Sequence, residues 1–125
     1  MIVLVCSAVL AIALKEPGSP RVLAALPQAV LSAANLAEVL IVIERKGGDA
    51  DQINADIENL GIPVVPIEKA HARIAAKIRR AHPTLNLSLG DCLCMALAIE
   101  RNCEVLTSDR EMTKVALGVT VTLFR

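Results

Sequence analysis

The apolar residues of this chain follow two alternating patterns along its length. Short uninterrupted runs rich in β-branched residues are typical of strands buried on both faces, whereas apolar residues three or four positions apart are typical of amphipathic helices. Strands are therefore predicted at residues 2–6, 29–31, 63–67, 104–107 and 119–123. Helices are predicted from residue 7 to about 16 and at 20–27, 49–61, 68–81 and 91–101, with a further helix from Ser32 or Asn35 to about Lys46 and a short helix or turn at 108–116.

Helices that alternate with buried strands favour a parallel sheet that is covered on both sides. We therefore expect an α/β fold, a three-layer α/β/α sandwich with a mainly parallel central sheet. The chain has 125 residues, of which 54% are hydrophobic, so it can bury one sizeable core. Residues 1–125 are expected to form a single domain.

Charge and aromatic content limit how the chain can bind nucleic acid. The 13 basic and 13 acidic side chains cancel, which argues against binding of a polyanion by bulk charge alone, so any anion has to be bound locally. Phe124 is the single aromatic residue, so a platform for stacking bases is missing. Contact with a nucleic acid would therefore be made through its phosphates.

The first apolar run ends at Lys15 and is too short to span a bilayer. A signal peptide is an alternative, because residues 11–13 (AIA) resemble a cleavage site, but no basic residue precedes the run. The four cysteines, Cys6, Cys92, Cys94 and Cys103, lack the CxxC spacing of a zinc site. They are interpreted as reduced, buried packing residues of a cytoplasmic protein without a membrane segment.

Three carboxylates stand beside apolar segments where an acid is unexpected. Glu38 lies in the helix after the second strand, Asp91 begins the apolar helix at 91–101, and Asp109 follows the strand at 104–107 by two residues. Ligands of open α/β sheets collect at the carboxyl ends of the strands. We therefore expect Glu38, Asp91 and Asp109 to face one crevice.

Carboxylates that share a crevice repel one another unless a divalent cation lies between them. Oxygen ligands without histidine or cysteine select Mg²⁺ or Mn²⁺ over zinc. Such an ion lowers the pKa of a bound water and neutralises charge on a scissile phosphate, which is the chemistry of phosphodiester hydrolysis. A chain of zero net charge could then still act on RNA.

Each acid also has a purely structural interpretation. The segment from Ser88 to Asp91 resembles a capping box, Asn35 to Glu38 can be interpreted in the same way, and Asp109 could cap a helix that follows Ser108. Caps account for each acid separately but not for their convergence.

Several segments together resemble one known family. MIVLVCSAVLAIALKEPGS, LSAANLAEVL, LSLGDCLCMALAIE, EVLTSDREM and GVTVTLFR, in this order over nearly the whole chain, are similar to the PIN-domain ribonucleases, and specifically to the VapC-type toxins of bacterial toxin–antitoxin pairs. The resemblance implies an α/β/α sandwich, a Mg²⁺- or Mn²⁺-dependent endoribonuclease, a homodimer, and a partner antitoxin that blocks the site. By resemblance, Glu38, Asp91 and Asp109 match three of the four family acids, and Ser7 and Thr107 match accessory hydroxyl groups at the metal site.

The fourth family acid is absent. Family members usually end the first strand with D-x-S, where this chain has Val5, Cys6 and Ser7. Cys6 is a poor substitute, because alternate side chains of a strand point to opposite faces. Loss of a ligating carboxylate should cost at least the roughly 10–100-fold that second-shell losses cost, so an impaired nuclease is predicted.

Other functions remain open. The chain could be an inactive PIN-like module that binds an antitoxin without doing chemistry. A nucleotide-binding doubly wound domain is weakly supported, because the first strand is followed by CSAVLA instead of a glycine-rich loop.

The helix at 68–81 carries the remaining candidates. His71 and His82 are expected to be solvated. The residues expected to face the core are Ala72, Ile74, Ala75 and Ile78. The basic residues are Lys69, Arg73, Lys77, Arg79 and Arg80. This basic side would either guide RNA phosphates or simply face solvent, and the second interpretation is favoured.

Overall fold

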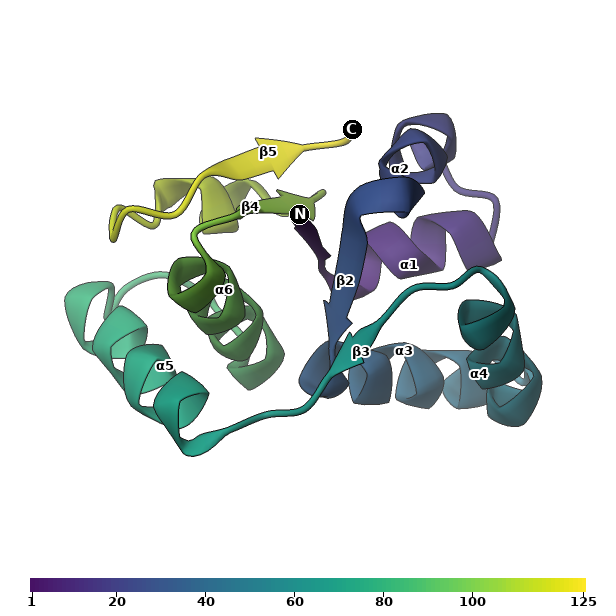
Figure 1. Cartoon of the computed structure of the whole chain (residues 1–125), viewed down its shortest axis with the longest axis horizontal. Helices are drawn as coiled ribbons and strands as arrows, with labels where there is room; N and C mark the ends of the chain where they lie inside the picture. The colour runs from purple at the N-terminus through teal and green to yellow at the C-terminus, as the bar shows by residue number, and fades with distance from the viewer.

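Five short parallel strands form the central sheet of the computed structural model, which describes residues 1–125 (Figure 1). The strands are β1 (Ile2–Leu4), β2 (Ala29–Ser32), β3 (Val64–Val65), β4 (Glu104–Thr107) and β5 (Val121–Leu123). Their order across the sheet is β3-β2-β1-β4-β5, which places the first strand of the chain at the centre. The predicted α/β fold with a parallel sheet is confirmed.

The register of the sheet separates two hydrophobic cores. Val3 lies opposite Val30 of β2 and Val105 of β4, and all three belong to the core on one face. Leu4 and its partners in the neighbouring strands belong to the core on the other face. Successive residues of a strand point to opposite faces, so both faces of these strands need apolar residues.

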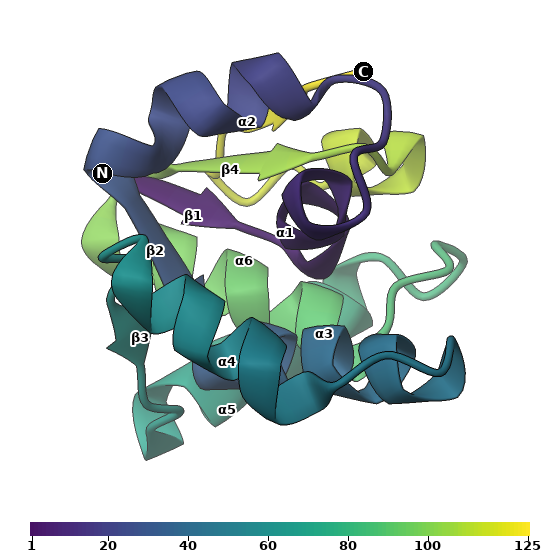
Figure 2. The same ribbon diagram turned by 90° about the vertical axis from the view of Figure 1, so that its right-hand side faces the viewer.

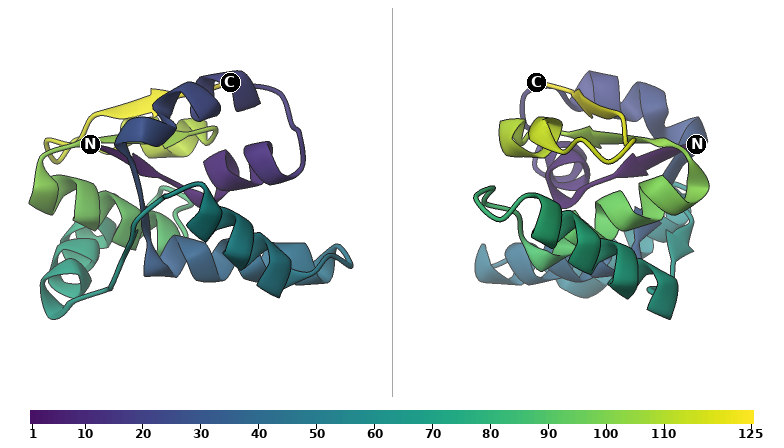
Figure 3. Two further views of the ribbon diagram at one scale, coloured as in Figure 1. Left: turned by 45° about the vertical axis from the view of Figure 1, so that its right-hand side comes forward. Right: turned by 90° about the vertical axis from the view of Figure 1, so that its left-hand side faces the viewer.

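Helices cover both faces of the sheet. The first core is closed by α5 (Lys69–Ala81) and α6 (Leu89–Arg101), which pack side by side (Figure 3). The second core is closed by four helices, of which α3 and α4 run next to each other (Figure 2). These four helices are α1 (Cys6–Ala13), α2 (Ser19–Ala25), α3 (Ala33–Arg45) and α4 (Ala50–Asn59). Two 3₁₀ turns complete the chain, η1 (Leu26–Gln28) and η2 (Arg110–Lys114).

Several boundaries differ from the predicted ones for local reasons. The first strand stops at Leu4, because Val5 takes the extended N-cap position of α1 and the helix begins at Cys6. Helix α1 ends at Ala13, three residues before the predicted end. Strand β3 has only two residues, because prolines on either side of it lack the N–H that would extend the ladder.

Serine caps set the starts of two helices, α3 and α6. Ser32 caps α3 by accepting the N–H of Asn35, so the alternative start at Asn35 is wrong. Ser88 caps α6, which therefore begins at Leu89, two residues earlier than predicted.

On α5, Ala75 and Ile78 are buried as expected and Ile74 is half-buried, but Ala72 is exposed.

No helix of the structure combines the length and the apolar character that crossing a membrane requires.

Two leucines of α6 offer a matched test of the core on the α5–α6 face. Leu97 is 1% exposed and Leu89 is 74% exposed. Leu97→Ala should lower the free energy of unfolding by about 2–5 kcal/mol, because it leaves a cavity. Leu89→Ala should change it by no more than about 0.5 kcal/mol. Urea titration followed by circular dichroism measures both, and equal effects would contradict the burial of α6.

Candidate active site at the carboxyl edge of the sheet

The carboxyl ends of β2, β1 and β4 lie next to one another at one edge of the sheet. Val5 follows β1, α3 with Glu38 follows β2, and Asp109 follows β4. The connection that leaves β1 crosses one face, through α1, while the helix that leads into β4 covers the other. Ligands of α/β folds bind at strand ends where such a reversal occurs. None of the hollows of this structure, however, is lined by Glu38, Asp91 or Asp109.

Glu38 is held between α3 and α6. The Asn35 side-chain amide donates to Glu38 Oε1 at 2.7 Å, and the Ser88 hydroxyl donates to Glu38 Oε2 at 3.3 Å. Both carboxylate oxygens therefore have a protein donor. The half-buried carboxylate is thus tolerated because it is hydrogen-bonded.

Asn35 and Gly90 allow this close approach of the two helices. Asn35 is 0% exposed, and its amide nitrogen also donates to the Gly90 carbonyl oxygen at 3.3 Å. Because both neighbours of this nitrogen are acceptors, the orientation of the amide is fixed, and Asn35 Oδ1 is left without a partner. A Cβ atom at position 90 would collide with the Glu38 carboxylate, so a larger residue fits there only if that carboxylate moves away from α6.

Asp91 forms the capping box of α6, as one of its two interpretations predicts. The Ser88 N–H donates to Asp91 Oδ2 at 2.9 Å, and the Asp91 N–H donates to Ser88 Oγ at 3.0 Å. Burial raises the pKa of Asp91, and the Asp109 charge raises it further, against the lowering effects of the Ser88 hydrogen bonds and of Arg79. Asp91 and Asp109 are therefore close enough to interact electrostatically.

Asp109 caps η2 by accepting the N–H of Glu111 at 2.9 Å. Its own N–H donates to Thr107 Oγ1 at 3.0 Å, and the N–H of Ser108 donates to Ser7 Oγ at 3.2 Å. Ser7 and Thr107 thus fix the backbone that carries Asp109. These bonds place both hydroxyl groups beside the loop after β4.

Val5 and Cys6 occupy the centre of this edge. Val5 is 3% exposed, belongs to the core under α6, and supplies no oxygen. Cys6 is half-buried, and burial together with the charges of Glu38 and Asp91 raises the pKa of its thiol to about 12. The thiol therefore lies in the field of two acids that are far apart in the sequence.

The arrangement does not fit a divalent cation as it stands. No three histidine, cysteine, aspartate or glutamate side chains lie close enough together to hold one ion. Glu38, Asp91 and Asp109 each have at least one carboxylate oxygen engaged by a protein donor. The acids converge on one edge, but they are held there by helix caps and by Asn35.

The expectation that the histidines are solvated is wrong for His71. Its ring is 3% exposed, Nδ1 accepts the Glu68 N–H at 3.0 Å, and Nε2 lies 2.8 Å from Glu100 Oε1. Because Nδ1 accepts, Nε2 carries the proton and donates it to Glu100. His82 is half-buried and accepts the Ala116 N–H at 3.3 Å, so neither histidine lies with the acids.

The cysteines are all free, as expected, but only two of them are fully buried. Cys92 and Cys94 lie within α6, whereas Cys6 and Cys103 are half-buried.

Three residues of the site are not predictable from sequence patterns alone. Asn35, Ser88 and Gly90 have the pattern of helix-start residues, and their contacts with Glu38 depend on how α3 packs on α6. A buried amide in an otherwise apolar helix is the one available signal for Asn35, because such a group needs a partner.

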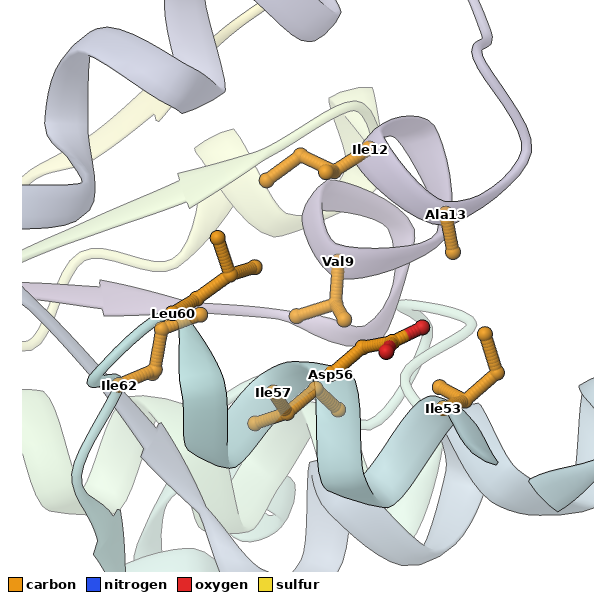
Figure 4. Close-up of a pocket in the computed structure, with 8 residues that line it drawn as sticks. All are labelled: Val9, Ile12, Ala13, Ile53, Asp56, Ile57, Leu60 and Ile62. Atoms are coloured by element: carbon orange, nitrogen blue, oxygen red, sulfur yellow. The ribbon is translucent and has the colours of Figure 1, made fainter. Parts of the chain in front are cut away.

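One hollow lies away from the acids, between α1 and α4 (Figure 4). It has a volume of about 220 Å³, and seven of its eight lining residues are hydrophobic. Val9 and Ile12 approach from α1, Ile53 and Ile57 from α4, and Asp56 is the only charged side chain in its lining. This hollow offers apolar contact but no catalytic groups.

Gly90→Ala tests the contact between Glu38 and α6. The new methyl group should displace the Glu38 carboxylate from Asn35 and Ser88, lowering the free energy of unfolding by about 1–3 kcal/mol. In a Glu38→Ala background the same change should be neutral or stabilising by up to about 1 kcal/mol, because alanine favours a helix. Urea titration of the unmodified chain, the two single variants and the double variant gives the coupling energy between positions 38 and 90. An equal effect of Gly90→Ala in both backgrounds would contradict the contact.

The raised pKa of Cys6 predicts slow alkylation, because only the thiolate reacts. Iodoacetamide should label Cys6 more slowly in the native protein than in the urea-unfolded chain, as followed by peptide mass spectrometry. Glu38→Gln should accelerate native labelling, because it removes a negative charge while an oxygen that can accept from Asn35 stays in place. The matched control, Glu58→Gln on exposed α4, should leave the rate unchanged; equal rates in all variants would refute the effect of the charge.

Comparison with known proteins adds to this geometry. Among solved structures, a toxin–antitoxin complex from Klebsiella pneumoniae is similar with a TM-score of 0.77 at 16% identity, over 100% of this chain and 98% of that chain. VapBC2 from Rickettsia felis, bound to a DNA fragment of its promoter, has a TM-score of 0.77 at 17% identity, over 98% of each chain. VapC20 from Mycobacterium tuberculosis, a toxin that cleaves the sarcin-ricin loop, has a TM-score of 0.78 at 14% identity, over 95% of this chain and 98% of that chain.

At these identities the likeness to solved structures establishes the fold. No curated protein matches the chain in sequence. The model of the PIN domain family matches residues 2–117, which is nearly the whole chain and includes Glu38, Asp91 and Asp109. The chain belongs to the PIN domain family.

Proposed function

We propose that the chain is a VapC-type toxin, an endoribonuclease whose cleavage of RNA phosphodiesters is impaired by Val5. The supporting observation is the set of acids that reaches the carboxyl edge from three elements, with an apolar residue at the end of the central strand between them. Glu38, Asp91 and Asp109 are the proposed catalytic residues, and Ser7 and Thr107 the accessory ones. Residues 1–125 form the single PIN domain of this proposal.

Mg²⁺ or Mn²⁺ is the proposed cofactor of the unimpaired activity, because the available groups are carboxylates and hydroxyls. A missing ligand at position 5 and carboxylates already engaged by caps both weaken such a site. These two features are the proposed structural cause of the impairment. The loss of activity should be at least the roughly 10–100-fold loss that removal of an outer-shell partner causes.

The same observations favour a second candidate, an inactive module that binds an antitoxin. Its support is that no three ligating side chains converge tightly enough for an ion. The hollow between α1 and α4 gives such a module an apolar surface for a partner (Figure 4). Co-purification with a small antitoxin, without Mg²⁺ binding in calorimetry, would favour this candidate.

A homodimer in the cytoplasm completes the proposal. Large apolar side chains stay exposed on the monomer, among them Leu89, Ile41 and Ile67, and such residues are common in subunit interfaces. Four free cysteines agree with a reducing compartment.

Val5→Asp tests the proposed function. A carboxylate at this buried position, at the end of the strand between β2 and β4, should lower the free energy of unfolding by about 1–3 kcal/mol in the presence of a chelator. Mn²⁺ should restore stability, because a ligand that binds only the folded state stabilises that state. Cleavage of RNA should also appear. Thermal unfolding with and without Mn²⁺, and cleavage of total RNA, measure the two effects.

Val5→Asn is the matched control for this experiment. Asparagine has nearly the shape and polarity of aspartate, but it adds no charge. It should show neither stabilisation by Mn²⁺ nor cleavage. If Val5→Asp also stays inert with Mn²⁺, the impaired-nuclease proposal fails and the binding module stands.

A further inference from the structure

The solvent face of α5 carries a stripe of four cations. Lys69, Arg73, Lys77 and Arg80 recur at intervals of four, four and three residues, and all four are exposed. Residues with this spacing share one side of a helix, with about 6 Å of axial rise per four residues. These four residues are called the α5 stripe.

The α5 stripe is not neutralised within the molecule. The ion pairs of the structure are those of His71 with Glu100, Lys114 with Glu111 and Arg125 with Glu16, and none involves the stripe. Like charges four residues apart destabilise a helix, so the stripe weakens α5 unless an anion binds it. Because the chain as a whole has zero net charge, this positive field is local to α5.

Apolar hollows border the stripe. Ile74, Ile99 and Leu117 line a hollow of about 380 Å³ together with Lys77, Arg80 and Ala81. A smaller hollow of about 180 Å³ adjoins it, lined by Ala70, Arg73, Ile74 and Lys77. The cations therefore stand at the rim of apolar surface, an arrangement that suits a strand with charged phosphates and less polar bases.

The C-terminal end of α5 lies beside the acidic edge. The Arg79 guanidinium donates to the Leu85 carbonyl at 3.0 Å and also to the Leu87 carbonyl, in the loop that leads to Ser88. Figure 3 shows α5 running along α6, whose first turn carries Asp91. The stripe thus extends from this end of α5 over about 16 Å of helix, at 1.5 Å per residue.

We propose that the α5 stripe binds the phosphates of a single-stranded RNA segment that continues from the acidic edge. This inference rests on the proposed function, and it assigns the path of the substrate. The row of cations follows a backbone in the way that positively charged grooves follow single strands. A chain with one aromatic residue relies on phosphate contacts, because it cannot stack bases.

The experiment measures binding of the unmodified chain and of two fourfold variants to a fluorescent oligo-uridine by anisotropy, from about 50 to about 200 mM salt. The test variant replaces Lys69, Arg73, Lys77 and Arg80 with glutamine, which preserves helix propensity. The control variant replaces four exposed cations elsewhere with glutamine and changes the net charge equally. These are Lys15, Arg21, Arg45 and Lys46.

The test variant should bind at least about tenfold more weakly at about 50 mM salt, and its salt slope should be shallower by about 3, at about 0.7 per phosphate contact. The control variant should keep the slope of the unmodified chain. Equal losses in both variants, an unchanged slope, or absence of RNA binding by the unmodified chain would each overturn the proposal. Binding of fluorescent polyglutamate is measured in the same way, and its loss in the test variant with unchanged RNA binding would overturn the proposal in favour of an acidic protein partner.

Failure of this inference and failure of the proposed function are distinguishable. If Val5→Asp stays inert while the α5 variant shows the expected shallower salt dependence of RNA binding, the nuclease proposal fails and the binding surface stands. If Val5→Asp cleaves RNA with the same KM and kcat whether or not the stripe is present, the nuclease stands and the surface fails.

Discussion

The contact of Asn35 with Glu38 and Gly90 joins the two faces of the molecule at the edge where the acids meet. A single buried amide donates to a carboxylate on its own helix and to a carbonyl of α6, so it sets how far α3 stands from α6. Gly90 lets the carboxylate lie directly against α6. Without this contact Glu38 could turn toward solvent, and the convergence of the acids would be lost.

Helix capping explains where the other acids stand. Asp91 and Asp109 each accept a backbone N–H at a helix start, and these starts follow or precede strands that end at the same edge. The structural and the functional interpretations of these residues are therefore compatible: a cap fixes the carboxylate, and the sheet topology brings the caps together. In this chain the caps are satisfied and the central position is Val5, so the structural role is complete while the metal-binding role is not.

Much of the fold followed from the sequence, because a parallel sheet covered on both faces needs apolar runs of the kind seen at Val3 and Val105. The capping box of Ser88 and Asp91 was also predictable, because its partners are three residues apart. The role of Asn35 was not, because Gly90 is 55 residues away in the chain. The burial of His71 was not predictable for the same reason, since its partner Glu100 belongs to another helix, 29 residues further on.

A crystal structure of the unmodified chain soaked in Mn²⁺, with an anomalous difference map, tests most directly the claim that this PIN domain lacks a complete metal site. No ordered ion is expected among the carboxylates, and Asn35 and Ser88 should still be bound to Glu38. An ion held jointly by Glu38, Asp91 and Asp109 would contradict it, because three acids would then suffice without an oxygen at position 5.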